Sequence, residues 1–166
     1  MINKINYLFV TLFGLGTLTK IPGSIASLTT IIILFFVIHV LTISVDLVLF
    51  FVFLVFFLGL FSINSYIKNN KDKDPKEIVI DEFVGQSIPI CLYEIAHPYP
   101  KDNNTVLTFY FIMFILFRIF DIIKPYPVSY YDKNFKNSFG VIMDDVCAGL
   151  YVVAILVFYM ILTTWG

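Results

Sequence analysis

The chain is 166 residues long, enough for one domain, and 59% of its residues are hydrophobic while only 14% are charged. A soluble domain carries roughly 25% charged residues, so this composition excludes a disordered tail, a nucleic-acid-binding protein and most soluble enzymes. The net charge of −1 provides no global attraction for a polyanion, so any anion site must be local. Cys91 and Cys147 lie in apolar segments at no metal-ligand or redox spacing, and we expect both to be packing residues.

The first apolar run follows Lys4 and ends at Leu18, and it has two interpretations. One is a cleaved signal peptide with Ser24-Ile25-Ala26 as the cleavage site. The other is an interfacial or half-buried helix that leads into a glycine turn. Gly14 and Gly16 interrupt the apolar run, so we favour the helix.

Long uncharged segments predict the membrane-spanning helices. Leu28–Ser44 and Leu47–Ile63 each reach about 26 Å at ~1.5 Å per residue, close to the ~30 Å of a hydrocarbon core. Two further segments are Thr105–Phe117, which apolar residues extend to Ile123, and Val146–Leu162. These four segments predict four membrane spans.

A weaker apolar stretch, Ile78–Ala96, decides the topology, because lysine and arginine concentrate on the cytoplasmic side of a membrane protein. If this stretch crosses as a short helix with a polar start, every basic residue except Lys101 falls on one side. A re-entrant stretch would split the basic residues, so we favour the crossing. The polar run Lys68–Lys76 is typical of a solvated cytoplasmic loop. We therefore predict an all-α, polytopic membrane protein of a single domain, residues 1–166, with about five membrane-embedded helices.

Five acidic residues adjoin apolar segments, where charges are costly. A charge at the bilayer centre costs roughly 2.5–3.5 kcal/mol on insertion scales, so such residues are candidates for a functional site. On the predicted topology all five reach the same membrane face, although a simpler interpretation is interfacial charges paired with nearby lysines. The five residues are Asp81, Glu82, Asp121, Asp144 and Asp145.

Basic side chains suited to phosphate lie beside one of these acids. Arg118, Asp121 and Lys124 are spaced three residues apart, which places them along one side of a helix that Pro125 ends. An arginine fork bonds two phosphate oxygens at once, so we expect Arg118 and Lys124 to bind phosphate. The alternative is a ladder of ion pairs that anchors the helix at the membrane surface.

A segment rich in glycine and hydroxyl residues, 14–27, precedes the first predicted span. Backbone N–H groups at the start of a helix bind phosphate, so Ser24 and Ser27 are candidate phosphate-binding residues. The alternative is a turn followed by a helix N-cap at one of these serines.

The charge balance of this set favours a cation. Five carboxylates against Arg118 and Lys124 leave about −3 if all are ionised, so the site must protonate, spread out or bind a cation. Ligation by several carboxylate oxygens suits Mg²⁺, which also accepts phosphate oxygens. We therefore expect Mg²⁺ among Asp81, Glu82, Asp121, Asp144 and Asp145.

Four ordered motifs carry a resemblance to a known family. The motifs are Pro22-Gly23-Ser24-Ile25-Ala26-Ser27, Asp81-Glu82-Phe83-Val84-Gly85, the stretch from Arg118 to Pro125, and Asp144-Asp145-Val146-Cys147-Ala148-Gly149. In this order the motifs resemble those of the phosphatidylglycerophosphatase A family. The chain has Ser24 where that family has threonine and Ala26 where it has glycine, and Asn137 and Ser138 stand where it tends to have glycines.

The resemblance implies a Mg²⁺-dependent phosphatase that converts phosphatidylglycerophosphate to phosphatidylglycerol in a bacterial inner membrane, with its active site on the cytoplasmic side. We expect Asp81, Asp121, Asp144 and Arg118 to be the catalytic residues. The phospholipid and the bilayer are the expected partners, nucleic acid is not, and the oligomeric state stays open. The competing hypothesis is an ion-coupled membrane transporter that uses the intramembrane carboxylates.

Overall fold

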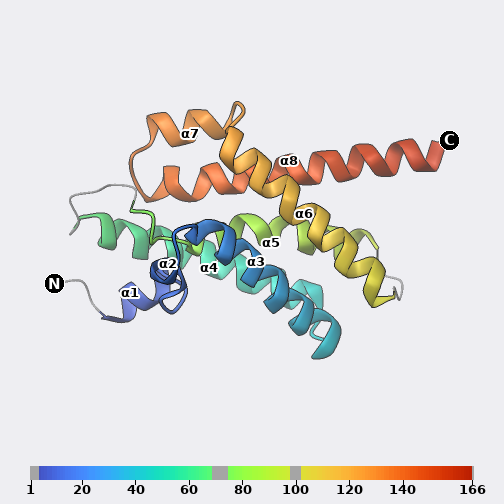
Figure 1. Ribbon diagram of the computed structural model, residues 1–166, viewed down its shortest axis with the longest axis horizontal. Coiled ribbons are helices and arrows are strands. Elements are labelled where there is room, and N and C mark those ends of the chain that lie inside the picture. The colour runs from blue at the N-terminus through green and yellow to red at the C-terminus, as the bar shows by residue number, and fades with distance from the viewer. Residues whose placement is uncertain (1–3, 69–74, 98–101, 166) are drawn as a thin grey trace.

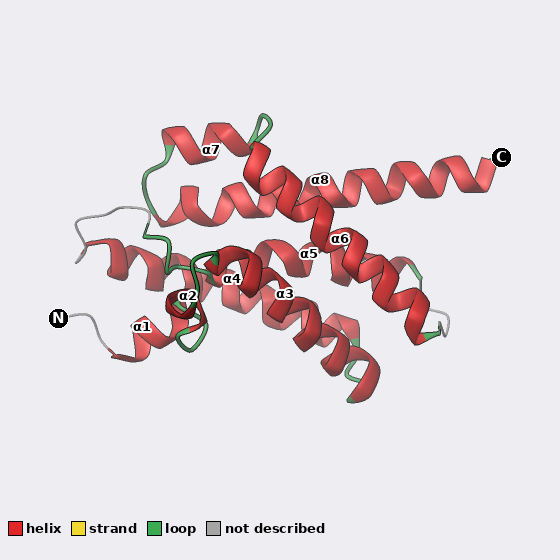
Figure 2. Ribbon diagram, viewed as in Figure 1, coloured by secondary structure: helices red, strands yellow, loops and turns green. Residues whose placement is uncertain are grey.

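The computed structural model describes residues 4–68, 75–97 and 102–165, and all regular structure in these residues is helical (Figure 2). Lys101, on which the predicted topology partly depended, lies outside the described residues. Eight α-helices and one π-helix follow one another in these ranges. They are α1 (Lys4–Val10), α2 (Leu15–Leu18), α3 (Pro22–Phe35), η1 (Phe36–Val40), α4 (Val45–Lys68), α5 (Ile80–Ala96), α6 (Asn103–Ile123), α7 (Val128–Asn134) and α8 (Ser138–Trp165).

Four of the described segments are long and apolar enough to cross a membrane: Pro22–Val40, Val45–Lys68, Asn103–Ile123 and Ser138–Thr163. The four predicted spans are therefore confirmed as apolar helices, but each predicted span is shorter than the helical segment observed. The first begins at Pro22 instead of Leu28, because a proline is well tolerated in the first turn of a helix, where its missing N–H is not needed. The last begins at Ser138 instead of Val146, so Asp144 and Asp145 lie inside it.

The short helix α5 lies at the centre of the bundle. It packs against α8, α3, α4 and α6, and 12 of its 17 residues are buried. Figure 1 shows α3 and α6 running diagonally beside each other while α8 runs along the long axis of the molecule. The starts of α3, α5 and α8 and the end of α6 lie toward the same end of the bundle. Polar residues at these four helix ends can therefore meet.

The N-terminal region forms two short helices beside the bundle. Gly14 adopts the left-handed conformation, with φ of 96°, between α1 and α2. Val79 N–H donates to the carbonyl of Val10, which ties α1 to the segment before α5. This arrangement matches the predicted half-buried helix that leads into a glycine turn.

At the other end of α5, His39 lies in the π-helix η1. Its ring packs against those of Phe35 and Tyr110, and Nε2 lies 3.3 Å from Oε1 of the buried Glu94. His39 is therefore a packing residue of the bundle. Sequence reasoning did not single out Glu94.

Candidate active site

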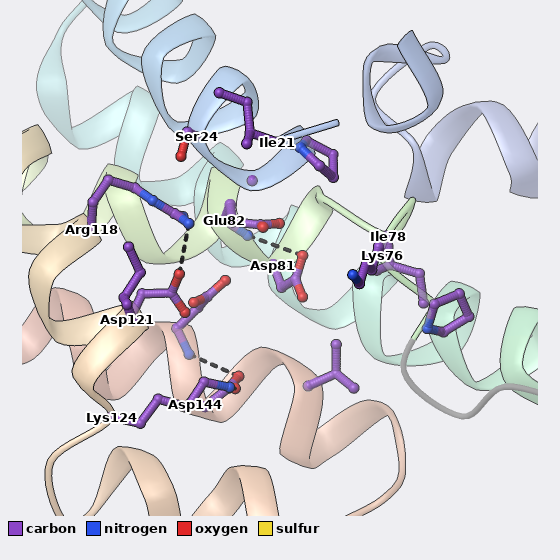
Figure 3. A pocket seen from close by; sticks show the side chains of 16 residues that line it. Ile21, Ser24, Lys76, Ile78, Asp81, Glu82, Arg118, Asp121, Lys124 and Asp144 are labelled. Carbon is purple, nitrogen blue, oxygen red and sulfur yellow. Dashed lines mark hydrogen bonds and ion pairs between the residues drawn. The ribbon is translucent and has the colours of Figure 1, made fainter. Parts of the chain in front are cut away.

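The five acidic residues singled out from the sequence line one pocket of about 420 Å³ at the end of the bundle where the four helix ends meet (Figure 3). Asp81 and Glu82 come from the first turn of α5, Asp121 from the last turn of α6, and Asp144 and Asp145 from α8. Residues far apart in the sequence therefore share one cavity.

Two glycines allow the helices that carry four of these acids to touch. A Cβ at Gly85 would lie 2.7 Å from the backbone oxygen of Asp145, and a Cβ at Gly149 would collide with the backbone oxygen of Gly85. Only residues without a side chain permit α5 and α8 to approach this closely. The glycines of two sequence motifs thus place Asp81 and Glu82 against Asp144 and Asp145.

Three of the five acids form a compact cluster. Asp81, Glu82 and Asp145 each offer a carboxylate oxygen within 4.8 Å of the other two. Asp81 and Asp145 are buried, and Oε2 of Glu82 is buried with no hydrogen-bond partner in the described part of the chain. Buried carboxylates with a free oxygen are expensive unless a cation binds them. The donor set therefore fits a hard divalent cation.

The two remaining acids are paired with basic residues. Asp121 Oδ2 accepts from Nη2 of Arg118 at 2.9 Å, and Asp144 Oδ2 accepts from Nζ of Lys124 at 2.9 Å. These pairings reduce the negative charge of the pocket. They also hold Arg118 and Lys124 at its wall.

Arg118 lies where α3, α5 and α6 meet. A Cβ at Gly23 would lie 3.2 Å from Nη1 of Arg118 and would collide with Oε1 of Glu82, so the glycine keeps this corner open. Nη1 also lies 3.5 Å from Oγ of Ser27. Nε of Arg118 is buried without a partner among the described residues. Asp121 and Ser27 thus hold the two terminal nitrogens of the guanidinium, and Arg118 lines the pocket.

The structure places the two serines inside α3 instead of at its N-cap. Ile21 is the N-cap residue and provides no side-chain hydrogen bond. Ser27 is buried and its Oγ donates to the carbonyl of Gly23 at 2.9 Å, whereas Ser24 lines the pocket. Only Ser24 therefore has a hydroxyl directed at the cavity (Figure 3).

Lys124 is not on the helix face predicted for it. It follows the last residue of α6, which ends before Pro125, and adopts the left-handed conformation, with φ of 49°, that commonly closes a helix. Its Nζ is 2.7 Å from Oδ1 of Asp132 on α7 and 2.9 Å from Oδ2 of Asp144. Lys124 therefore bridges two carboxylates and connects α7 to α8.

Charge stabilises this bridge. Burial lowers the pKa of a lysine, but the carboxylates of Asp144 and Asp132 outweigh burial and raise the pKa of Lys124 above its ordinary 10.5. Burial raises the pKa of a carboxyl group, but the hydrogen bond from Lys124 outweighs burial and lowers the pKa of Asp132 below its ordinary 3.8. Both groups stay charged at neutral pH.

Replacing Asp132 with asparagine should lower the melting temperature in detergent at neutral pH, by the equivalent of about 1 kcal/mol for a partly exposed ion pair. Because the pKa of Asp132 is lowered in the folded protein, its contribution is present above its ordinary value of 3.8 and is lost as the pH falls through the lowered value. The difference in melting temperature between the two proteins should therefore shrink at acidic pH. A difference that persists unchanged at pH 3 would contradict the bridge.

Sequence reasoning missed several residues in and around the pocket, among them Asp132, Lys76 and Ile122. Asp132 carried no motif, and only its partner Lys124 had been singled out. Lys76, Ile21 and Ile122 line the cavity. Lys76 was taken as part of a solvated loop, and nothing in its neighbourhood distinguished it from other surface lysines.

The fold and the pocket define a helical membrane protein with a carboxylate-rich site beside an arginine, the class to which enzymes of phosphorylated lipids belong. The model of the family Phosphatidylglycerophosphatase A matches residues 8–160. The chain belongs to this family.

Relatives with established names support the same conclusion. The chain is 34% identical over 157 residues to the phosphatidylglycerophosphatase A of Haemophilus influenzae, covering 93% of this chain and 88% of the relative. It is 30% identical over 146 residues to that of Escherichia coli K12, covering 88% of this chain and 78% of the relative. A Bacteroides thetaiotaomicron protein, provisionally named a phosphatidylinositol-3-phosphatase, is 41% identical over 95 residues, which cover 57% of this chain and 54% of the relative. No solved structure matches.

Family and relatives make the chain a phosphatidylglycerophosphatase, a phosphoric monoester hydrolase of phospholipid metabolism. The hypothesis of an ion-coupled transporter is therefore not needed to explain the buried carboxylates.

Proposed function

We propose that the protein hydrolyses the terminal phosphate of phosphatidylglycerophosphate with the help of Mg²⁺ bound in the acidic pocket. The observation that carries the proposal is the cluster of Asp81, Glu82 and Asp145, whose oxygens lie within 4.8 Å of one another beside Arg118. A bound Mg²⁺ would neutralise negative charge on the phosphate and lower the pKa of a coordinated water.

In this proposal the residues of the pocket bind the cation, bind the phosphate or position another side chain. Asp81, Glu82 and Asp145 hold the cation, with Asp121 and Asp144 at the edge of the site. Arg118 binds the phosphate with the side of its guanidinium that Asp121 does not occupy. The hydroxyl of Ser24 donates a hydrogen bond to a phosphate oxygen. Lys124 adds positive charge to the pocket wall and positions Asp144.

The attacking group is either water or a carboxylate of Asp81, Asp121 or Asp144. In both routes the phosphate must be held in line with the attacking oxygen, and Arg118 supplies that orientation. Only the head group needs to leave water for this step, because the acyl chains stay in the bilayer.

The purified protein in detergent tests the proposal directly. Phosphate release from phosphatidylglycerophosphate should stop after dialysis against EDTA and return with added Mg²⁺, because charge neutralisation and positioning supply most of the acceleration of phosphate ester hydrolysis. Phosphatidic acid, which has no glycerol between its phosphate and the lipid, is the comparison substrate. No release at any Mg²⁺ concentration would overturn the proposed function, and release that EDTA leaves unchanged would overturn the role of the metal.

We also propose that α5 crosses the membrane as a fifth helix and that the site faces the cytoplasm. Lys20, Lys68, Lys76, Lys124 and Lys133 all adjoin the helix ends that lie toward the pocket, and basic residues concentrate on the cytoplasmic side. α5 is shorter than the four candidate spans, but its buried surface is covered by other helices, so it does not need to match the bilayer alone.

Cysteine labelling in intact bacteria checks this topology. Asn103→Cys, at the start of α6, should react with a membrane-impermeant thiol reagent before the cells are opened, because it lies at the end of α5 and α6 away from the pocket. Lys133→Cys, on α7 beside the pocket end, should react only after permeabilisation. Reaction of Asn103→Cys only after permeabilisation, or of Lys133→Cys before it, would contradict a crossing α5 with the site on the cytoplasmic side.

A further inference from the structure

Two large apolar side chains on the rim of the charged pocket have no role in the chemistry above. Ile21, directly before α3, is 61% exposed, and Ile122, in the last turn of α6, is 71% exposed. Both line the pocket that contains the acids, and Figure 3 shows Ile21 on its α3 side. An exposed isoleucine does not help a phosphate to bind from water, so these side chains point to an apolar part of the ligand.

Each isoleucine stands at the end of an exposed apolar row on a candidate membrane span. On α3 the row continues from Ile21 to Leu28 and Ile32, and on α6 it continues from Ile122 to Ile115 and Phe111. In both rows the residues are spaced seven and then four positions apart, which places them on one helix face. The exposed apolar surface of the two spans therefore extends as far as the rim of the pocket.

The start of α3 and the end of α6 both contribute to the lining of the pocket. Nη1 of Arg118 lies 3.5 Å from Oγ of Ser27, which links α6 to α3. Ile122 follows Arg118 by one helical turn and Ile21 precedes Ser27 by six residues, so both isoleucines lie on the pocket side of this link.

The level of the two isoleucines also fits the membrane surface. Lys20 precedes Ile21 and Lys124 follows Ile122 by two residues, and basic residues flank the ends of membrane helices at the headgroup level. The rim therefore combines apolar side chains for acyl chains with basic neighbours for anionic head groups.

We propose that the cleft between the start of α3 and the end of α6 is a lateral opening through which a phospholipid reaches the pocket from the bilayer. Ile21 and Ile122 contact the first methylene groups of the acyl chains while the head group extends to Arg118 and the acids. This inference rests on the proposed function and adds that the site selects an acylated substrate.

Kinetics with two substrates test the inference. The double variant Ile21→Gln with Ile122→Gln should raise the KM for dioleoyl phosphatidylglycerophosphate in mixed micelles about ten-fold with little change in kcat, because contacts made equally in the ground and transition states affect KM. Its kinetics on the deacylated head group, glycerophosphoglycerophosphate, should stay within about two-fold of the parent. Leu18→Gln, which is 75% exposed on α2 and does not line the pocket, is the matched control and should change neither substrate.

Equal losses on both substrates, or no loss on the lipid, would overturn the lateral opening.

If the parent protein releases phosphate from neither substrate, the proposed function fails and a separate measurement decides the inference. Bimane attached to Ile21→Cys or Ile122→Cys should be quenched by phospholipids spin-labelled near the top of the acyl chain, in phosphatidylethanolamine–phosphatidylglycerol vesicles. Bimane at Lys133→Cys should not be quenched, and the native cysteines are buried and should not react. Equal quenching at all three positions, or none at the isoleucines, would contradict the opening.

Discussion

Asp81→Asn should reduce phosphate release by about 10³-fold or more, since it removes one of three carboxylates that would hold the cation. Asn keeps the size of the side chain but contributes no charge. The change also removes a buried negative charge from a crowded acidic cluster, so the metal-free protein should melt at the same temperature as the parent or higher. Added Mg²⁺ should raise the melting temperature of the parent but not of the variant, because a ligand stabilises only a protein that binds it.

The matched control for this experiment is Asp46→Asn. Asp46 is an exposed acid in the first turn of α4, outside the pocket, and its replacement should alter neither activity nor the response to Mg²⁺. Near-normal activity in Asp81→Asn with an intact Mg²⁺ response would remove Asp81 from the site.

Gly149→Ala should lower both the stability and the activity of the protein. The added methyl group would collide with the backbone oxygen of Gly85, and a backbone atom cannot move aside as the end of a side chain does. Overpacking of this kind costs about 1–3 kcal/mol. Because the shift separates the acids of α5 from those of α8, activity should fall about 10²-fold even at temperatures where the protein stays folded.

Gly59→Ala provides the comparison. A Cβ at Gly59 would lie 3.1 Å from the terminal Cδ1 of Ile142 and 4.0 Å from Cγ2 of Ile80, and side-chain atoms give way more easily than backbone atoms. We expect this variant to keep most of its activity and to melt within a few degrees of the parent. Similar losses in both variants would show that the contact between α5 and α8 has no special role in the site.

Much of the site was predictable from the sequence because charges are rare in apolar segments. Each of the five acids interrupts an apolar run, and that cost singled them out before their positions were known. Arg118 was found by the same reasoning. These residues meet in one pocket because the starts of α5 and α8 and the end of α6 lie toward the same end of the bundle.

Other parts of the site depend on geometry that the sequence pattern does not contain. The spacing predicts Lys124 on a helix face, but Lys124 lies after the end of α6 in the left-handed conformation and contacts Asp132 and Asp144. Asp132 belongs to a polar segment in which an acid costs nothing, so no energetic signal marked it. The same holds for Lys76.

Span boundaries were the least predictable feature of the fold. Hydropathy marks where a helix meets lipid, whereas α3 and α8 continue into the polar pocket region, where their ends carry Gly23 and Asp144. The polar residues that form the site therefore belong to the same helices as the spans. This continuity gives the acids a rigid support.

We expect carboxylates from α5 and α8 to bind a divalent cation together, and Mn²⁺ titration followed by electron paramagnetic resonance measures this binding. In neutral detergent, the parent protein should remove free Mn²⁺ from solution by binding it at a saturable site for which Mg²⁺ competes. Asp81→Asn and Asp145→Asn, one from each helix, should both lose this binding while Asp46→Asn keeps it. Undiminished Mn²⁺ binding in both Asp81→Asn and Asp145→Asn would contradict the account.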